Sequence, residues 1–218
     1  MACFPLMVEI EGKTVIVIGG GRVALHKIKV LLPFGVNIRV ISEEFCDDLQ
    51  AFALSRENAD RITLIRKSFE KRDILHADDS DEVCFIVAAT DDEKLQSSVS
   101  ALCREKRIPI NVVDVKEKST FYFPAIIKKD DLVVAVSTGG NSPAAAGYIK
   151  DRIADRLPEY YGRLVETLGK YRELVLLKIE DYDERKRFFR ELLVYGEEHD
   201  GELPEHVVIE KLSQYDNK

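Results

Sequence analysis

Residues 14–24 read TVIVIGGGRVA, and this stretch decides the fold class. Its first five residues are β-branched, which is typical of a buried strand, and three glycines end the run. A helical pattern of apolar residues begins at Ala24. The order strand, G-x-G-x-x-A, helix is typical of a turn that binds a dinucleotide. In such a turn Gly19 permits a tight bend, Gly21 lets a pyrophosphate approach the backbone, and Ala24 lets the helix close onto the strand.

The start of this helix gives an electrostatic reason to expect a phosphate there. Unpaired backbone N–H groups and the positive end of the helix dipole both favour an anion at a helix N-terminus. The alternative is a tight strand-to-helix turn that binds no ligand. Because the strand and the helix are both present, we expect a dinucleotide.

The composition is that of a soluble globular protein. Of the 218 residues, 45% are hydrophobic and 33% are charged, which suffices for one large domain or two small ones. A net charge of −7 argues against a general nucleic-acid surface. No apolar run approaches the ~20 residues of a membrane helix. The first residues, MACFPLMVEIEGK, lack the basic start of a signal peptide.

The cysteines and histidines give no sign of a metal site, because they lie far apart without ligand spacing. We expect the cysteines to be reduced, mostly buried thiols in a cytoplasmic protein. The positions are Cys3, Cys46, Cys84, Cys103, His26, His76, His199 and His206.

Strands and helices alternate after the glycines. Pro33 and Gly35 should end the first helix near Leu32. Further strands are predicted over 36–41, 62–65, 83–89 and 110–113, and helices over 43–56, 72–76 and 93–107. This order predicts an α/β fold with a Rossmann-type doubly wound parallel sheet. The apolar segment 4–8 should cover an edge of the sheet.

The alternation ends after Asp114. Strands over 121–127 and 132–137, joined by the turn 128–131, predict a hairpin. The rest of the chain is predicted to be helical and charged. We divide the chain into domains 1–114, 115–143 and 144–218.

The helical part begins with a strong start signal, Ser142 as N-cap and Pro143 at the first helical position. Breaks are expected at Pro158 and Gly196, and the tail after Gly201 forms one more helix or frays. Ion pairs one helical turn apart are expected between Glu159 and Arg163 and between Glu166 and Lys170.

Acidic residues follow the second strand, in the sequence Ser42-Glu43-Glu44. In this fold an acidic residue about 20 positions past the glycines accepts hydrogen bonds from the adenosine ribose. Glu43 is the best candidate, and its charge would repel the 2′-phosphate of NADP, so NAD is favoured. Alternatively, Ser42 caps the next helix and both glutamates form its first turn. Both roles can hold together.

Three other segments have a functional and a structural interpretation. Thr90 or Asp91 can cap the helix 93–107, but the carboxyl end of the preceding strand also faces the cofactor crevice. Asp114 is a strand-end cap or, because of the same position, a functional carboxylate. The glycines of 138–142 form a nest of N–H groups for a carboxylate or a plain turn.

Several segments together resemble the precorrin-2 dehydrogenases, including the dehydrogenase/ferrochelatase part of siroheme synthase. They are VIVIGGGRVALHK (15–27), FIVAATDD (85–92), INVVD (110–114), FYFPAIIKKDDLVVAVSTGGNSPAAA (121–146) and IKDRIADRLP (149–158). The resemblance implies NAD-dependent oxidation of precorrin-2 to sirohydrochlorin. It also implies a Rossmann domain, a small strand-based dimerisation region, a helical C-terminal domain and a homodimer.

The resemblance implies roles for individual residues. Asp114 would be the catalytic carboxylate that accepts a proton or orients the macrocycle. The cofactor would contact Gly19, Gly20, Gly21, Arg22, Val23, Glu43, Glu44, Ala89, Thr90 and Asp91. The substrate would contact Asn111, Thr138, Gly139, Gly140, Asn141 and Ser142, with Lys116, Lys118, Lys128 or Lys129 as further donors to its carboxylates.

Some alternatives stay open. The chain has no room for the methyltransferase domain of longer siroheme synthases, so we expect a separate enzyme to supply precorrin-2. Insertion of Fe²⁺ as a second activity is undecided. Competing hypotheses are an NAD-responsive regulatory module, a standalone sirohydrochlorin ferrochelatase, and an NAD enzyme with another small substrate.

Overall fold

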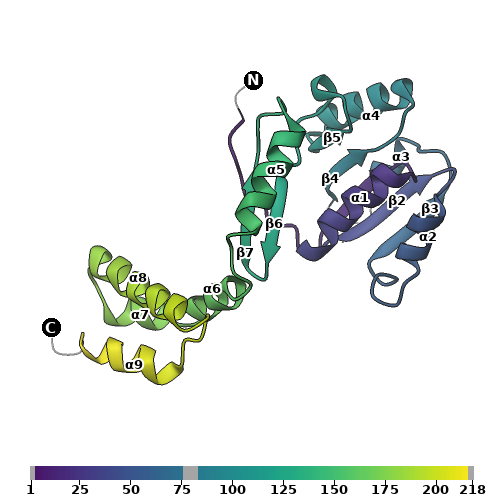
Figure 1. The fold of residues 1–218 in the computed structure, drawn as a ribbon. Helices are drawn as coiled ribbons and strands as arrows, with labels where there is room; N and C mark the ends of the chain where they lie inside the picture. The colour runs from purple at the N-terminus through teal and green to yellow at the C-terminus, as the bar shows by residue number, and fades with distance from the viewer. Residues whose placement is uncertain (1–2, 76–82, 216–218) are drawn as a thin grey trace. The chain divides into compact units, whose positions relative to one another are not determined.

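Five parallel strands form the main sheet, in the order β3-β2-β1-β4-β5 (Figure 1). The computed structural model describes residues 3–75 and 83–215. The strands are β1 (Thr14–Ile18), β2 (Asn37–Ser42), β3 (Ile62–Arg66), β4 (Val83–Ala88) and β5 (Ile110–Val112). The predicted doubly wound sheet is confirmed. Its strand order reverses between β1 and β4, where sheets of this type bind their ligands.

Helices cover both faces of this sheet. Val15 and Val17 of β1 pack into one core cluster with the first two helices, and Ile16 and Ile18 pack into another with α4. A strand buried on both faces reads as a continuous apolar run, which is what β1 is. The helices are α1 (Arg22–Leu31), η1 (Leu32–Phe34), α2 (Asp47–Ala53), α3 (Arg72–Leu75), α4 (Glu93–Lys106) and η2 (Lys116–Lys118). The predicted helical turn at 72–76 is present as α3, and His76 lies outside the described residues.

The helix predicted from residue 43 is wrong at its start. Its N-cap is Cys46, and Ser42 belongs to β2, so Ser42 does not cap the helix. Phe45 is buried in the core, and the Cys46 N–H donates to the Gly20 carbonyl at 2.9 Å. These contacts keep Glu43 and Glu44 in the connection ahead of α2.

The cap of α4 also differs from the prediction. Asp92, not Thr90 or Asp91, accepts hydrogen bonds from the Lys94 and Leu95 N–H groups, at 2.9 and 3.1 Å. Three adjacent residues of the TDD stretch can all act as caps, and the register of the strand selects the third. Thr90 and Asp91 therefore stay within the connection after β4.

The predicted hairpin consists of β6 (Ala125–Lys129) and β7 (Leu132–Val136), paired antiparallel. Its first strand begins four residues later than predicted, because Phe121 and Phe123 pack against Phe85 instead of extending the strand. Its turn is shorter, since Lys128 and Lys129 belong to β6 and Asp130 takes the left-handed conformation with φ 47°.

The expectation that the segment 4–8 covers a sheet edge is wrong for this chain. Phe4 is 88% exposed, Leu6 75% and Met7 71%. Packing begins at Ile10, which contacts the core cluster of α1, and the Gly12 N–H donates to the Gly35 carbonyl at 2.9 Å. The segment before Ile10 thus leaves apolar side chains in solvent.

The C-terminal part is helical, as predicted. Its helices are α5 (Pro143–Ala154), α6 (Tyr161–Lys170), α7 (Arg172–Lys178), α8 (Tyr182–Glu198) and α9 (Glu205–Ser213). Ser142 caps α5 through a bond from the Ala145 N–H at 3.2 Å, as predicted. A core cluster that includes Leu164, Val175 and Phe188 holds the last four helices together.

Two predictions about this helical part are wrong. Gly196 does not break a helix, because α8 continues through it; a Cβ at Gly196 would lie 2.5 Å from Leu164 Cδ1, so the glycine serves close packing. Glu159 pairs with Lys129 at 2.6 Å rather than with Arg163. The pair of Glu166 and Lys170 forms as predicted, at 2.9 Å.

The chain divides into two compact units. One runs to Phe123 and includes Gly139–Asn141, and the other comprises 124–138 and the chain from Ser142. Our three-domain division stays a prediction. The four cysteines are free thiols, as expected, but the prediction that most are buried is wrong, because only Cys103 is buried; its burial raises the pKa of its thiol to about 11. Within the described residues, no helix has the length and apolar character needed to cross a membrane.

Candidate active site

At two of the three positions after β1, neighbouring backbone lies so close that only glycine fits. Gly19 has φ +112°, and a Cβ there would collide with the Ala89 carbonyl oxygen and lie 2.7 Å from its carbon. A Cβ on Gly20 would collide with the Glu44 carbonyl oxygen and lie 2.8 Å from Phe45 Cδ1. The glycine turn thus packs closely against the backbone of the two connections that follow β2 and β4.

Gly21 differs from its two neighbours. A Cβ on Gly21 would have no described atom within 4 Å. Gly21 is the N-cap of α1, and the first turn of the helix carries Arg22 and Val23 rather than an acidic residue. Open space next to a helix N-terminus fits a pyrophosphate, which the backbone N–H groups and the helix dipole would stabilise. The residues present therefore fit a dinucleotide.

Glu43 and Glu44 are exposed beyond the carboxyl end of β2. The Ser68 hydroxyl donates a hydrogen bond to Glu43 Oε1, which fixes the direction of that carboxylate. Arg66 Nη1 donates to the Glu43 carbonyl at 3.3 Å, and its guanidinium lies 5.3 Å from the ring centre of Phe45. The sequence did not single out Ser68 and Arg66, although the predicted strand over 62–65 ends beside them.

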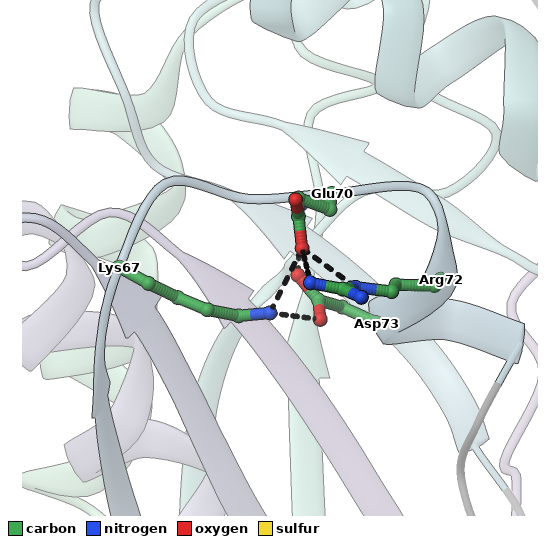
Figure 2. A network of polar contacts seen from close by, with 4 residues as sticks. All are labelled: Lys67, Glu70, Arg72 and Asp73. Atoms are coloured by element: carbon green, nitrogen blue, oxygen red, sulfur yellow. Dashed lines mark hydrogen bonds and ion pairs between the residues drawn. The ribbon is translucent and has the colours of Figure 1, made fainter.

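An ion-pair network braces the loop that carries Ser68 (Figure 2). Lys67 Nζ bonds to Asp73 and lies 3.5 Å from Glu70, and Arg72 Nη2 lies 2.7 Å from the same Glu70 carboxylate. The hydrogen bond to Asp73 raises the pKa of Lys67. The residues on both sides of Ser68 are therefore tied to α3.

The connection after β4 meets the glycine turn. The Ala89 N–H donates to the Ile18 carbonyl at 2.7 Å, which aligns the ends of β4 and β1. Thr90 accepts a bond from Gln96 Nε2 at its carbonyl, at 2.6 Å, and Asp91 is exposed. Ala89 and Thr90 are thus held rigidly at the carboxyl ends of two neighbouring strands.

Asp114 follows β5 at the same edge of the sheet. It has φ 59°, in the left-handed region that aspartate tolerates better than most residues. Asn111, which we predicted to contact substrate, is buried, and its Nδ2 donates to the Phe121 carbonyl at 3.1 Å. The chain after β5 is therefore folded back onto the strand, with Asp114 at the bend.

Two lysines near this edge make contacts that the sequence did not indicate. Lys27, on α1, places its Nζ 4.5 Å from the ring centre of Phe123, and burial lowers its pKa, an effect that the negative charge of Asp114 partly opposes. Lys116 is one of four loop lysines that the sequence does not distinguish from one another, and its Nζ donates to the Gly139 carbonyl at 2.9 Å. Sequence spacing alone gives no signal for either contact.

The Thr138 hydroxyl makes both of its hydrogen bonds within the loop 138–142, while the Ser142 hydroxyl accepts from the Ala145 N–H of α5. The Ser142 N–H donates to Thr138 Oγ1 at 3.1 Å, while Thr138 Oγ1 donates to the Ser142 carbonyl at 2.9 Å. Gly139 and Gly140 both have positive φ, 62° and 79°, so the turn depends on glycine. Asn141 is exposed beside them.

Comparison with protein families agrees with this geometry. The family model described as "Putative NAD(P)-binding" matches residues 6–125, more than half of the chain. The chain belongs to this NAD(P)-binding family. A second model, sirohaem biosynthesis protein central, matches residues 129–156.

The curated relatives that this chain matches include siroheme synthases. That of Thioalkalivibrio sulfidiphilus is 37% identical over 193 residues, covering 88% of this chain and 37% of the relative. That of Ectopseudomonas mendocina is 35% identical over 192 residues, covering 88% and 39%. The predicted resemblance is confirmed, and the chain spans well under half the length of these relatives.

A solved structure has the same fold. SirC, precorrin-2 dehydrogenase, superposes with a TM-score of 0.74 at 22% identity, and the match covers 99% of this chain and 100% of that one. The match confirms the predicted sheet, the small antiparallel strand pair and the C-terminal helices. Among the residues that the structure of our chain describes, no group of three or more His, Cys, Asp or Glu side chains could hold a metal ion.

Proposed function

We propose that the chain oxidises precorrin-2 to sirohydrochlorin with NAD. The observation that carries the proposal is the open space at Gly21, next to the N-terminus of α1, on the same sheet edge as Asp114. The match of residues 129–156 to a sirohaem biosynthesis model supports the pathway. The likeness to SirC, precorrin-2 dehydrogenase, and to the siroheme synthases supports this substrate.

The residues divide the chemistry between them. NAD, when bound, supplies the acceptor for a hydride from the saturated macrocycle. Loss of that hydride must be accompanied by loss of a proton, and the Asp114 carboxylate accepts it or orients the ring. Gly19, Gly20, Gly21, Arg22 and Val23 would hold the pyrophosphate side. Ala89, Thr90 and Asp91 would line the nicotinamide side.

The substrate carries acetate and propionate groups, so its site needs hydrogen-bond donors. Backbone N–H groups of the loop 138–142 and the Lys116 ammonium are candidates, because anions favour such groups. Asn111 would act through the segment that it fixes. The proposed substrate contacts are Thr138, Gly139, Gly140, Asn141 and Ser142.

An anaerobic assay tests the proposal. Purified protein, NAD and enzymatically made precorrin-2 should yield NADH and sirohydrochlorin in equal amounts. The absorption spectrum of each product measures its amount. Binding of NAD without turnover would overturn the proposal and favour a regulatory module or another substrate. The same assay with Fe²⁺ as an added substrate tests ferrochelation, in which Asp114 would take pyrrole N–H protons.

NAD should be preferred over NADP because of Glu43. We expect Glu43→Gln to reduce the preference by about tenfold or more, since it removes a negative charge from the 2′-phosphate position and leaves Arg66 nearby. Titration of NADH and NADPH fluorescence measures both dissociation constants. Glu57→Gln, an exposed change in the α2–β3 connection, is the matched control. An unchanged ratio in Glu43→Gln would show that another group makes the choice.

We propose that the protein is cytoplasmic and forms a homodimer. The exposed apolar side chains of Phe4, Leu6 and Met7 and the two-stranded β6–β7 sheet support a second copy as partner. Free thiols support a reducing compartment.

A further inference from the structure

The Glu43 carboxylate has a neutral partner from the next strand of the sheet. Ser68 lies two residues beyond the end of β3, and its hydroxyl donates a hydrogen bond to Glu43 Oε1. Ser42 pairs with Arg66 in the sheet, and the Lys67 N–H donates to the Ser42 carbonyl at 3.1 Å, so the two strand ends stay in register up to this loop. The carboxylate is therefore held from a neighbouring strand.

The loop that carries Ser68 is fixed on both sides of this residue. The Asp73 carboxylate bonds to Lys67 Nζ on one side (Figure 2), and it accepts from the Glu70 N–H on the other side at 2.8 Å. Phe69 packs against the core cluster shared with α4. A donor on a braced loop loses little conformational entropy when it forms its bond. The hydroxyl is thus in place before a cofactor binds.

Arg66 is a cation that could compete for the Glu43 carboxylate. Its Nη1 donates to the Glu43 main-chain carbonyl at 3.3 Å, and its guanidinium lies over the ring of Phe45. In the part of the chain that the structure describes, Arg66 makes no ion pair with this carboxylate, which bonds to Ser68 instead. A guanidinium would bind a carboxylate through charge-assisted hydrogen bonds and neutralise it. A hydroxyl satisfies one oxygen and leaves the negative charge intact.

This negative charge determines how the end of β2 treats a dinucleotide. A free carboxylate accepts a hydrogen bond from the adenosine ribose of NAD, and it repels the 2′-phosphate of NADP. A carboxylate paired with Arg66 does neither well, since the guanidinium occupies its oxygens and offers the phosphate a cation. The partner of Glu43, a hydroxyl or a guanidinium, therefore decides which cofactor is favoured.

We propose that Ser68 is a positioning residue for cofactor choice, whose hydroxyl holds the Glu43 carboxylate away from Arg66 and open toward the adenosine ribose. The inference rests on the proposed function, because it assumes that the adenosine lies at the carboxyl end of β2. Ser68 acts through Glu43 and is assigned no contact with the cofactor. The connection after β3 thereby becomes part of the cofactor site.

Fluorescence titration with NADH and NADPH tests this role. Ser68→Ala should raise the dissociation constant of NADH by about three- to tenfold, the contribution of one hydrogen bond, and should lower the preference for NADH over NADPH by the same factor. Ser68→Thr keeps the hydroxyl and should retain the wild-type ratio of the two constants. Ser213→Ala is the matched control, because this exposed serine of α9 donates to the Glu210 carbonyl at 2.7 Å. It should match the wild type.

A second substitution separates positioning from a merely structural role. Arg66→Gln removes the guanidinium that would capture Glu43, so it should restore most of the NADH preference that Ser68→Ala loses. The gain from Arg66→Gln should be larger in Ser68→Ala than in the wild type, because only there does the guanidinium reach the carboxylate. A loop that had lost its shape would show no such rescue. An unchanged cofactor ratio in Ser68→Ala, or an equal gain in both backgrounds, would overturn the inference.

The same titrations distinguish this inference from the proposed function. A wild type that oxidises precorrin-2 with NAD, and whose cofactor ratio does not respond to Ser68→Ala, overturns the role of Ser68 alone. A wild type that binds NAD without turnover overturns the proposed oxidation, while the cofactor ratios still decide on Ser68. A wild type that binds neither dinucleotide overturns both.

Discussion

Replacing Asp114 by asparagine should lower kcat for precorrin-2 oxidation by about 10²- to 10⁴-fold, the usual contribution of a general acid or base. This corresponds to about 3–5 kcal/mol of transition-state stabilisation. Asparagine keeps the shape of the side chain but cannot accept a proton. NAD affinity should change by less than about twofold, because the glycine turn is untouched.

The backbone of Asp114 dictates the choice of asparagine over alanine. At φ 59° asparagine is tolerated, whereas alanine would add strain to the loss of the carboxylate. Asp200, with φ 51° in the α8–α9 connection, gives a matched control. Asp200→Asn should keep wild-type kcat and melting temperature. Full activity of a folded Asp114→Asn protein would remove Asp114 from the mechanism.

The glycine turn should separate folding from cofactor binding. Gly20→Ala places a Cβ against the Glu44 carbonyl oxygen and 2.8 Å from Phe45 Cδ1. Since both lie in a packed connection, we expect a loss of about 3 kcal/mol or more in the free energy of unfolding. Gly21→Val enters open space and an extended backbone with φ −87°, so its cost should stay within about 1 kcal/mol.

NAD binding should respond in a different way to the Gly21 change. The valine side chain would occupy the space left for the pyrophosphate, and NAD affinity should fall by about 100-fold or more. Denaturant unfolding and calorimetric NAD titration of both variants measure the two effects. Tight NAD binding by a folded Gly21→Val protein would mean that the cofactor does not lie on this turn.

The parts of the fold that follow from local patterns were predictable. The β1 run, the glycine turn, and the Ser142-Pro143 helix start each carry their signal within a few neighbouring residues. Asp114 could be predicted as a candidate because the carboxyl ends of parallel strands share one edge.

Features that depend on tertiary contacts were not predictable. α2 starts later than predicted because Phe45 packs into the core. Phe121 lies outside the hairpin because its ring packs against Phe85. The sequence predicts a helix break at Gly196, because only the folded structure shows that Leu164 packs against this glycine. The sequence gives no signal for the contact of Lys27 with the Phe123 ring, because the two residues lie far apart in the chain.

The unequal roles of the three glycines have an evolutionary consequence. Changes at Gly19 or Gly20 should destabilise the fold, so selection for folding alone would preserve these two positions. Gly21 is preserved only while a cofactor is needed. A duplicated gene could therefore drift, through one substitution, into a folded descendant without redox activity, and the residue at this position would mark which descendants are still enzymes.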